Sequence, residues 1–264
     1  MGAKPHSSSL RGREKGAGLK IRLDKLVVTR GLAPSRERAQ ALILAGKVLV
    51  NGQKIEKAGH PVEKEAEVKL LGEDLRYVSR GGLKLEKALE HFHLDVSGMV
   101  CVDVGASTGG FTDCLLQHGA RRVIAIDTGY GQIAHALRND PRVSLLERTN
   151  ARYLKPGDLP EPADLVVIDV SFISATLVLP AIVAAAFPEE KRGKRIIVLV
   201  KPQFEAGREQ VGKGGIVHDE SAQQQAVEKV RQALIALGCS RTEVVESPIR
   251  GAEGNREFLL LGTF

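Results

Sequence analysis

Cysteines are few in this sequence and lie far apart. The chain of 264 residues has three, Cys101, Cys114 and Cys239, each among apolar neighbours. An odd number of distant cysteines does not make the paired framework of a small secreted protein, and it lacks the close spacing of zinc ligands. We therefore expect no disulfide framework and no metal site, as in a protein of the reducing cytoplasm.

Long apolar runs are also missing. The longest mostly apolar stretch extends from Thr176 to Phe187 and contains Pro180. It is shorter than the roughly 20 residues that a helix needs to cross a bilayer. Residues 1–20 lack the apolar core of a secretory signal. Both observations disfavour membrane insertion and secretion, so we expect a cytoplasmic protein without a membrane partner.

Positive charge is concentrated near the N-terminus. Residues 1–80 carry 17 Lys and Arg against 9 Asp and Glu, a net charge of +8, whereas residues 81–264 carry 21 against 23, a net charge of −2. A basic module on a nearly neutral body suggests a polyanionic partner, because basic side chains displace counterions from phosphates. A solvated surface would have the same composition, so charge alone leaves both interpretations open.

The basic region predicts two short helices and a hairpin. From Ile21 onward the pattern indicates one short helix, and Ser35 is a good N-cap for a second helix that ends at Gly46. Residues 48–55 predict two strands, because the Asn51-Gly52 pair in their middle is a strong hairpin signal.

A known RNA-binding module has the same order of elements. The matching residues are Arg22-Leu-Asp-Lys25, Ser35-Arg36, Ala39, Ile43, Gly46, Val48, Val50-Asn51-Gly52 and Lys54. On these residues the region resembles the S4 domain, which implies that its basic face contacts RNA phosphates and positions the RNA without reading its sequence. The implied RNA-binding residues are Arg22, Lys25, Arg36, Arg38, Lys47 and Lys54. A purely structural role for these charges remains the alternative.

Strands and helices alternate through the rest of the chain. Candidate strands lie at 100–104, 123–127, 165–169, 196–201, 243–245 and 258–264, and candidate helices lie at 83–92, 111–118, 132–138, 175–186 and 222–237. This alternation is typical of a doubly wound α/β sheet. The last two strands follow each other without a helix, which predicts a final antiparallel hairpin of the kind common in methyltransferases.

A glycine-rich turn follows the first of these strands. Gly105, Gly109 and Gly110 would let the backbone pass close under a ligand at the carboxyl ends of the strands. Asp103 and Asp127 flank the ligand position, and two acids suit the amino and ribose groups of S-adenosylmethionine better than the pyrophosphate of a nicotinamide dinucleotide, the alternative cofactor. The expected cofactor-binding residues are Asp103, Gly105, Ala106, Ser107, Thr108, Gly109, Gly110, Phe111, Thr112 and Asp127, with Asn150 and Arg152 near the adenine.

Two further charged residues end apolar strands. Asp169 ends the run at 165–169, and Lys201 ends the run at 196–201, directly before Pro202. Side chains at these strand ends face the ligand crevice of an α/β sheet. A single charged strand end is often only solvated, but two on one sheet favour a functional site.

Five motifs stand in a fixed order behind the S4-like module. They are Ser79-Arg-Gly-Gly-Leu-Lys-Leu85, the turn at 103–113, Asp169-Val-Ser-Phe172, Lys201-Pro-Gln-Phe-Glu205 and Gly254-Asn-Arg-Glu-Phe258. In these motifs the chain resembles the TlyA family of rRNA methyltransferases, related to the FtsJ fold. The resemblance implies a Rossmann-like α/β methyltransferase domain with an antiparallel C-terminal hairpin, preceded by a small α+β S4-like domain.

The resemblance also implies a catalytic tetrad, which falls on Lys84, Asp169, Lys201 and Glu257. A ribose hydroxyl is a poor nucleophile, and its in-line attack on a methyl group requires positioning and loss of its proton. Lys201 would lie nearest the hydroxyl, either assisting deprotonation or stabilising alkoxide charge. The implied reaction is 2′-O-methylation of rRNA with S-adenosylmethionine as the methyl donor. The implied target is cytidine of 16S or 23S rRNA in ribosomal subunits. The enzyme could be a monomer or a dimer.

The expected domain division has four parts. Residues 1–19 form a flexible basic tail, 20–75 the S4-like domain, 76–82 a linker and 83–264 the FtsJ-like domain. Some members of the family have Arg-Xaa-Trp-Val at the linker, whereas this chain, which has no tryptophan, has Leu75-Arg76-Tyr77-Val78. In other members, the linker is thought to couple RNA docking to cofactor binding. Because the motif differs here, we do not extend that coupling to this chain.

Two other classes of function compete with methyl transfer. An RNA-binding ribosome-assembly factor with an inactive catalytic domain would keep the S4-like module, but an intact tetrad and glycine turn argue against it. Members of the family are also described as haemolysins, yet the sequence offers no signal, no spanning segment and no strongly amphipathic basic helix for a membrane-active protein.

Overall fold

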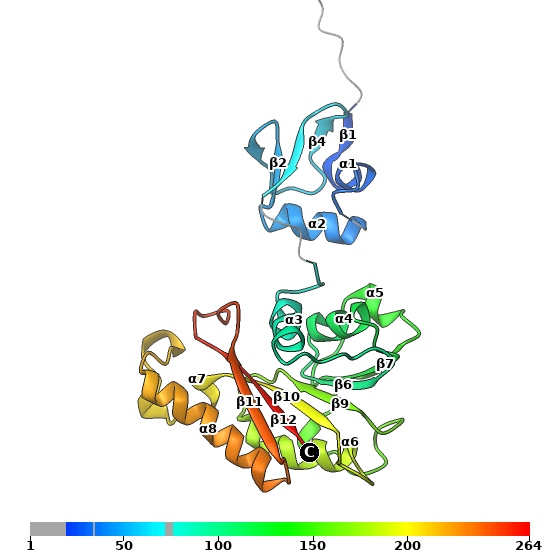
Figure 1. The fold of residues 1–264 in the computed structure, drawn as a ribbon. Coiled ribbons are helices and arrows are strands. Elements are labelled where there is room, and N and C mark those ends of the chain that lie inside the picture. Colours follow the sequence, from blue (N-terminus) through cyan, green and yellow to red (C-terminus); the bar gives the residue numbers. More distant parts are fainter. Residues whose placement is uncertain (1–19, 34, 72–75) are drawn as a thin grey trace, which may run out of the picture. The chain divides into compact units, whose positions relative to one another are not determined.

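The computed structural model describes residues 20–33, 35–71 and 76–264. It divides the chain into two compact units, Met1–Asp74 and Leu75–Phe264 (Figure 1). The expected tail at 1–19 and residues 72–75, at the end of the expected S4-like domain, lie outside the described residues.

The smaller unit contains the predicted helices and hairpin. Helix α1 is Leu23–Thr29 and helix α2 is Arg36–Leu44, and the Ser35 hydroxyl accepts a hydrogen bond from the Arg38 amide at 3.2 Å, as a cap does. Asn51 and Gly52 have φ values of 49° and 79°, the left-handed pair that a type I′ turn requires. The hairpin strands are β2 (Val48–Val50) and β3 (Gln53–Lys54).

Three short strands of the smaller unit were not predicted. They are β1 (Lys20–Arg22), β4 (Pro61–Glu63) and β5 (Val68–Leu70). β1 pairs with β4, and β5 pairs with β2, both antiparallel. Three residues are too few to display the two-residue periodicity by which a strand is recognised in a sequence. Together with the helices these strands bury a small apolar core around Leu23, Ile43 and Val48.

The larger unit is built on a seven-stranded sheet in the order β11-β12-β10-β9-β6-β7-β8. Its strands are β6 (Val100–Val104), β7 (Arg122–Ile126), β8 (Val143–Leu146), β9 (Leu165–Ile168), β10 (Arg195–Val200), β11 (Arg241–Glu246) and β12 (Phe258–Thr263). β12 runs antiparallel to both of its neighbours, whereas the pairs from β10 to β8 are parallel. The predicted antiparallel hairpin is thus present, and its second strand is inserted between the first and the parallel strands.

Helices cover both faces of this sheet (Figure 1). One apolar cluster joins residues of α3 and α4 to the sheet, and the other joins residues of α6 and α8 to its opposite face. The helices are α3 (Gly81–His91), α4 (Gly110–Gln117), α5 (His135–Arg138), α6 (Leu179–Ala186), α7 (Pro202–Glu205) and α8 (Glu220–Ala236), with short 3-10 turns at Ala151–Tyr153, Ala175–Leu177, Arg208–Gln210 and Lys213–Gly215.

Several predicted boundaries were wrong for local reasons. The helix predicted at 132–138 begins only at His135, because Ala134 has a non-helical ψ of 139° and its amide donates to the Thr108 carbonyl. The helix predicted at 175–186 is split, and Pro180, which lacks an amide hydrogen, lies in the first turn of α6. Strand β8 at the sheet edge and the single-turn helix α7 had not been predicted as separate elements.

Part of the segment expected to be a linker packs on the larger unit. Tyr77 is buried, and its hydroxyl donates to Glu86 at 2.9 Å. A Cβ on Gly82 would lie 2.2 Å from the Tyr77 ring, so the glycine makes room for it. The Val78 amide donates to the Asp113 carboxylate at 2.8 Å. Burial raises the pKa of the Tyr77 phenol, and the residue has the role of a core side chain.

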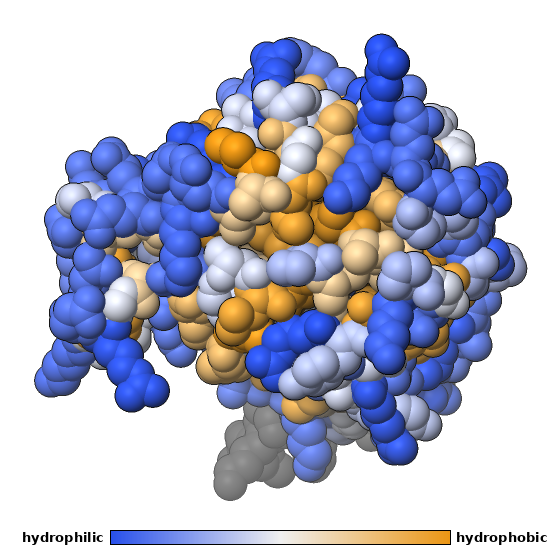
Figure 2. Space-filling view, turned by 90° about the horizontal axis from the view of Figure 1, so that it is seen from below, coloured by the Kyte–Doolittle hydropathy of each residue, from blue (hydrophilic) through white to orange (hydrophobic). Residues whose placement is uncertain are grey.

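One face of the molecule has an apolar area surrounded by hydrophilic side chains (Figure 2). The large apolar side chains exposed in the larger unit include Ile235 and Val244, on α8 and β11. Among the described residues, no helix has both the length and the apolar character required to span a membrane.

Candidate active site

Two adjoining cavities lie at the carboxyl ends of the parallel strands. The first has a volume of about 330 Å³ and the second about 750 Å³. The residues that line both are Gly105, Ser107, Asp169, Ser171 and Phe172. The carboxyl edge is where ligands of open α/β sheets bind, so the two cavities form one composite site with Asp169 at the junction.

The glycine turn between β6 and α4 forms the floor of this site. Gly105 has φ +86°, and a Cβ there would lie 2.5 Å from the Asp169 carbonyl oxygen. Gly109 has φ +99°, and a Cβ there would lie 2.3 Å from Leu137. Only glycine fits at both positions, because the left-handed backbone and the close neighbours both exclude a side chain.

The N-terminus of α3 crosses the turn at the first cavity. A Cβ on Gly110 would lie 2.2 Å from Ser79 Oγ and 3.3 Å from the Gly81 Cα. Neither α3 nor α4 has a side-chain hydrogen bond at its N-cap. Both helix starts line the first cavity, so the partial positive charge of the two helix N-termini favours an anionic group there.

Asp127 lines the second cavity only. It follows β7, and its carboxylate accepts hydrogen bonds from the Ser107 amide at 2.8 Å and the Gly129 amide at 2.6 Å. Asn150 and Arg152 line the same cavity, and Asn150 Oδ1 accepts from the Arg152 amide at 3.1 Å. Each carboxylate oxygen of Asp127 has a further lone pair, which suits a pair of ligand hydroxyls.

Three of the predicted cofactor residues line neither cavity. They are Asp103, Gly109 and Thr112. Asp103 is fully buried, and one of its oxygens accepts from the Thr112 hydroxyl at 2.7 Å while the other has no hydrogen-bond partner among the described residues. Burial raises the pKa of Asp103 to about 7, against the opposing effect of the Thr112 hydrogen bond. Asp103 therefore supports the turn from below. The other nine predicted residues line one or both cavities.

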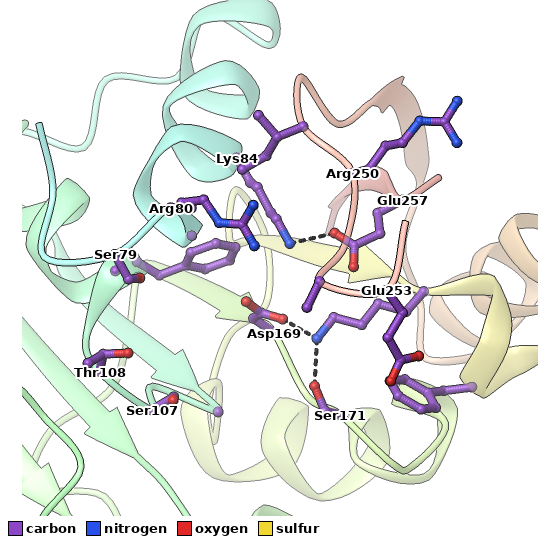
Figure 3. A pocket seen from close by; sticks show the side chains of 18 of the residues that line it. Ser79, Arg80, Lys84, Ser107, Thr108, Asp169, Ser171, Arg250, Glu253 and Glu257 are labelled. Atoms are coloured by element: carbon purple, nitrogen blue, oxygen red, sulfur yellow. Dashed lines mark hydrogen bonds and ion pairs between the residues drawn. The ribbon is translucent and has the colours of Figure 1, made fainter. Parts of the chain in front are cut away.

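The four predicted tetrad residues all line the first cavity, where they form two ion pairs (Figure 3). Lys84 Nζ lies 2.5 Å from Glu257 Oε2, and Lys201 Nζ lies 2.5 Å from Asp169 Oδ1. The side chains of Lys84 and Lys201 are 11% and 10% exposed. Two lysines and two carboxylates thus share one largely dehydrated space, where charges interact more strongly than in water.

The sheet brings three of these residues together. Lys201 follows β10 and Glu257 precedes β12, and antiparallel pairing of Val200 with Phe258 makes them neighbours. Asp169 follows β9, which is parallel to β10 and also ends at this edge. Lys84 comes from the first turn of α3, on the covering layer.

The same cavity contains residues that sequence reasoning did not single out. Ser171 accepts a hydrogen bond from Lys201 Nζ at 2.8 Å, and Arg80, Arg250 and Glu253 line the wall (Figure 3). Phe172 is 90% exposed at the rim, with φ +64°. Ser171, Phe172 and Arg80 lie inside the sequence motifs, so the signal was present, but only the charged strand ends could be interpreted without a structure.

In the smaller unit, the six predicted RNA-binding residues do not all have the same environment. Arg22 and Arg36 bind the buried carboxylate of Asp24 at 2.9 and 3.0 Å. The hydrogen bond from Arg22 is the main reason that the pKa of Asp24 is well below its usual range. Lys54 pairs with Glu56 at 2.8 Å, whereas Lys25 and Lys47 are exposed. The remaining residue of the set, Arg38, is half-buried on α2.

The donor set of the composite site can be compared with the possible cofactors. The second cavity has the Asp127 and Asp169 carboxylates and one arginine, Arg152, which does not suit the pyrophosphate of a dinucleotide. The partial positive charge at the N-termini of α3 and α4 matches the carboxylate of S-adenosylmethionine, and the carboxylate of Asp127 matches its ribose hydroxyls. Among the described residues there is no group of three or more His, Cys, Asp or Glu that could hold a metal ion.

The sheet order, the antiparallel β12 and this site define an S-adenosylmethionine-dependent methyltransferase fold. Residues 77–264 match the FtsJ-like methyltransferase family model, and residues 21–68 match the S4 domain model. The chain belongs to the TlyA family, whose members join these two domains.

Named relatives cover nearly the whole chain. The 16S/23S rRNA (cytidine-2′-O)-methyltransferase TlyA of Mycobacterium tuberculosis is 48% identical over 91% of this chain and 89% of its own. Hemolysin A of Brachyspira hyodysenteriae is 42% identical over 90% of this chain and 98% of its own. A solved structure named "Putative hemolysin from Streptococcus thermophilus" is 46% identical, with a TM-score of 0.70 over 94% of this chain and 90% of that chain.

Proposed function

We propose that this protein transfers a methyl group from S-adenosylmethionine to a ribose 2′-hydroxyl of ribosomal RNA. The observation that carries the proposal is the pair of lysine–carboxylate contacts around one cavity that shares Asp169 with a second, cofactor-sized cavity. The names of the relatives support cytidine of 16S or 23S rRNA as the nucleotide. We further propose that this nucleotide is presented in a ribosomal subunit.

The second cavity is proposed as the place of the nucleoside half of the cofactor. Asp127 would accept hydrogen bonds from the ribose hydroxyls, and Asn150 and Arg152 would lie beside the adenine. The turn at 105–111 and the N-terminus of α3 would hold the methionine end at the first cavity. When bound, S-adenosylmethionine supplies an electrophilic methyl group on a sulfonium sulfur.

The first cavity is proposed as the place of the ribose. Lys201 Nζ has its contacts with Asp169 and Ser171 on one side, and its remaining N–H would hold the hydroxyl oxygen or the alkoxide charge that develops there. The Lys84–Glu257 pair would complete the wall and orient the ribose. Positioning of this kind accounts for much of the rate of a transfer between two bound groups.

The smaller unit is proposed as the RNA-docking module, with 20–75 as its extent and 83–264 as the catalytic domain. Lys25 and Lys47 are exposed and would contact phosphates, together with the Arg22 and Arg36 guanidiniums. Replacing Lys25 and Lys47 by Glu should raise the KM for RNA and weaken its salt dependence, with kcat unchanged.

The test is transfer of radiolabelled methyl groups to 30S and 50S subunits from a strain that lacks the gene. Wild type is compared with Lys201→Ala and with Lys194→Ala, a control at the opposite end of β10 whose ammonium pairs with Asp164 at 2.8 Å. We expect label on a ribose 2′-oxygen with wild type and the control, and a loss of at least about 100-fold with Lys201→Ala.

Other outcomes would favour other functions. Cofactor binding without transfer to either subunit would contradict the proposed substrate and favour an assembly factor. If Lys201→Ala still transfers methyl groups, Lys201 is not required for the reaction. Label at a base position would contradict ribose methylation.

A further inference from the structure

The loop that follows Asp169, residues 170–174, separates the two cavities. Val170 and Ser174 line the second cavity, whereas Ser171 and Phe172 line both. The loop therefore lies where the methyl donor and its acceptor would meet. Any side chain that fixes this loop also fixes the distance between the two halves of the site.

Ser171 is the second partner of the Lys201 ammonium. The Lys201 Nζ donates to Ser171 Oγ at 2.8 Å and contacts Asp169 Oδ1 at 2.5 Å (Figure 3). An ammonium has three N–H groups, so these two contacts leave one for a ligand in the cavity. With Asp169 as its only partner, the Lys201 ammonium could rotate about that contact. A second acceptor, Ser171, fixes the direction of the third N–H.

Ser171 itself is exposed and lies outside helices and strands, so its position depends on what holds the loop. The end of the loop is held by Glu205, which is 6% exposed. Its carboxylate accepts from Ser174 Oγ at 2.5 Å and from the Ala175 amide at 2.6 Å. These are strong, charge-assisted contacts to a segment that would otherwise have free polar groups.

Glu205 also belongs to the element that follows the catalytic lysine. Helix α7 begins at Pro202, directly after Lys201, and Glu205 is its last residue. On the other side, Lys229 of α8 pairs with the Glu205 carboxylate at 3.4 Å and donates to its carbonyl oxygen at 2.8 Å. One buried carboxylate thus connects the end of β10, the 170–174 loop and α8.

We infer that Ser171 is a positioning residue for Lys201 and that Glu205 holds the loop that presents it. The inference rests on the proposed function, in which Lys201 meets the acceptor hydroxyl. Ser171 acts by fixing the direction of the free N–H of Lys201, and Glu205 acts only through Ser171 and its loop. Neither residue has to touch the RNA.

The first test compares Ser171→Ala with Ser171→Thr, which keeps the hydroxyl. Ser171 is exposed, so neither change should affect folding, and Ser240→Ala is a control that removes an exposed hydroxyl at the opposite edge of the sheet. We expect Ser171→Ala to lower kcat about 10- to 100-fold with less than about threefold change in the KM for RNA, as for a misdirected catalytic group. Ser171→Thr should recover most of the rate.

The role of Glu205 is tested by a double-mutant cycle. Glu205→Gln keeps a carbonyl for the Ala175 amide and should retain the rate within about threefold, whereas Glu205→Ala should be about as slow as Ser171→Ala. Because both act on one contact, adding Ser171→Ala to Glu205→Ala should change kcat less than about twofold. Thermal melts check that each variant is folded.

Each outcome decides the question. Unchanged kcat in Ser171→Ala, equal losses in the alanine and threonine variants, or multiplicative losses in the double variant would overturn the inference. Absence of methyl transfer by wild type would instead count against the proposed function, so the two failures are distinguishable.

Discussion

Asp103 lies in the core below the glycine turn, and its protonation should make the stability of the larger unit depend on pH. Burial raises the pKa of its carboxyl from the usual 3.8 to about 7 in the folded protein. The folded state therefore holds a proton that the unfolded chain releases between these two values. The contribution of Asp103 to the free energy of unfolding is highest below about pH 4, falls as the pH rises, and reaches its lower plateau above about pH 7.

The magnitude follows from the width of that window. Each pH unit between 3.8 and about 7 lowers the stability by roughly 1.4 kcal/mol, so the total is on the order of 4 kcal/mol. The substitution Asp103→Asn removes the titration but keeps an acceptor for the Thr112 hydroxyl. The Asn amide can also change the free energy of unfolding by an amount that does not depend on pH. That amount cancels when wild type and Asp103→Asn are compared at different pH values.

The assay is thermal unfolding of wild type and Asp103→Asn at pH 5 and pH 7. The stability difference should shift in favour of the variant by about 2 kcal/mol over this range. For a domain of this size that corresponds to roughly 4–8 °C in the Tm of the larger unit. Asp95→Asn, at an exposed carboxylate, is the control and should show no such trend. A difference between Asp103→Asn and wild type that is the same at both pH values would refute a protonated Asp103.

Three further substitutions test the geometry. Gly105→Ala should reduce cofactor affinity at least about 10-fold by calorimetry, because the new Cβ would lie 2.5 Å from a backbone oxygen. Gly157→Ala is the control, because Gly157 has φ +93° but no neighbour within 4 Å. It should cost only roughly 1–2 kcal/mol of stability from backbone strain and leave cofactor binding intact. Lys84→Met should cost about 3–5 kcal/mol in urea unfolding because it leaves the buried Glu257 carboxylate unpaired, and adding Glu257→Gln should recover part of this loss. Asp24→Asn should destabilise the smaller unit by roughly 2 kcal/mol at pH 7. Since the pKa of Asp24 is lowered in the folded state, the stability it contributes is present above about pH 4 and is lost as the pH falls, so the difference in melting temperature should shrink toward pH 2.

Much of the larger unit and its site could be predicted from the sequence because position along a parallel strand has a fixed meaning. Asp127, Asp169 and Lys201 follow apolar runs, and parallel strands bring their carboxyl ends to one edge. Glycines in a strand-to-helix turn likewise indicated close approach of the backbone, and the left-handed angles of Gly105 and Gly109 agree with it. These inferences depend on local patterns and on one rule of sheet architecture.

Contacts between distant segments could not be derived from local sequence patterns, although the family resemblance placed some of these residues in one tetrad. Lys84 and Glu257 are 173 residues apart, and nothing local in either segment indicates that they form a pair. Asp103 was expected beside the cofactor, but the inward direction of its side chain places it in the core, behind the turn.

The sequence by itself determined the elements, the edge of the sheet where the chemistry lies and the residue types available there. The tertiary structure decided which charges neutralise one another: Arg22 and Arg36 pair with Asp24, and Lys229 pairs with Glu205. The physical reason is that burial and pairing are properties of three-dimensional neighbours, and they alone determine whether a charged side chain is solvated, structural or directed at a ligand.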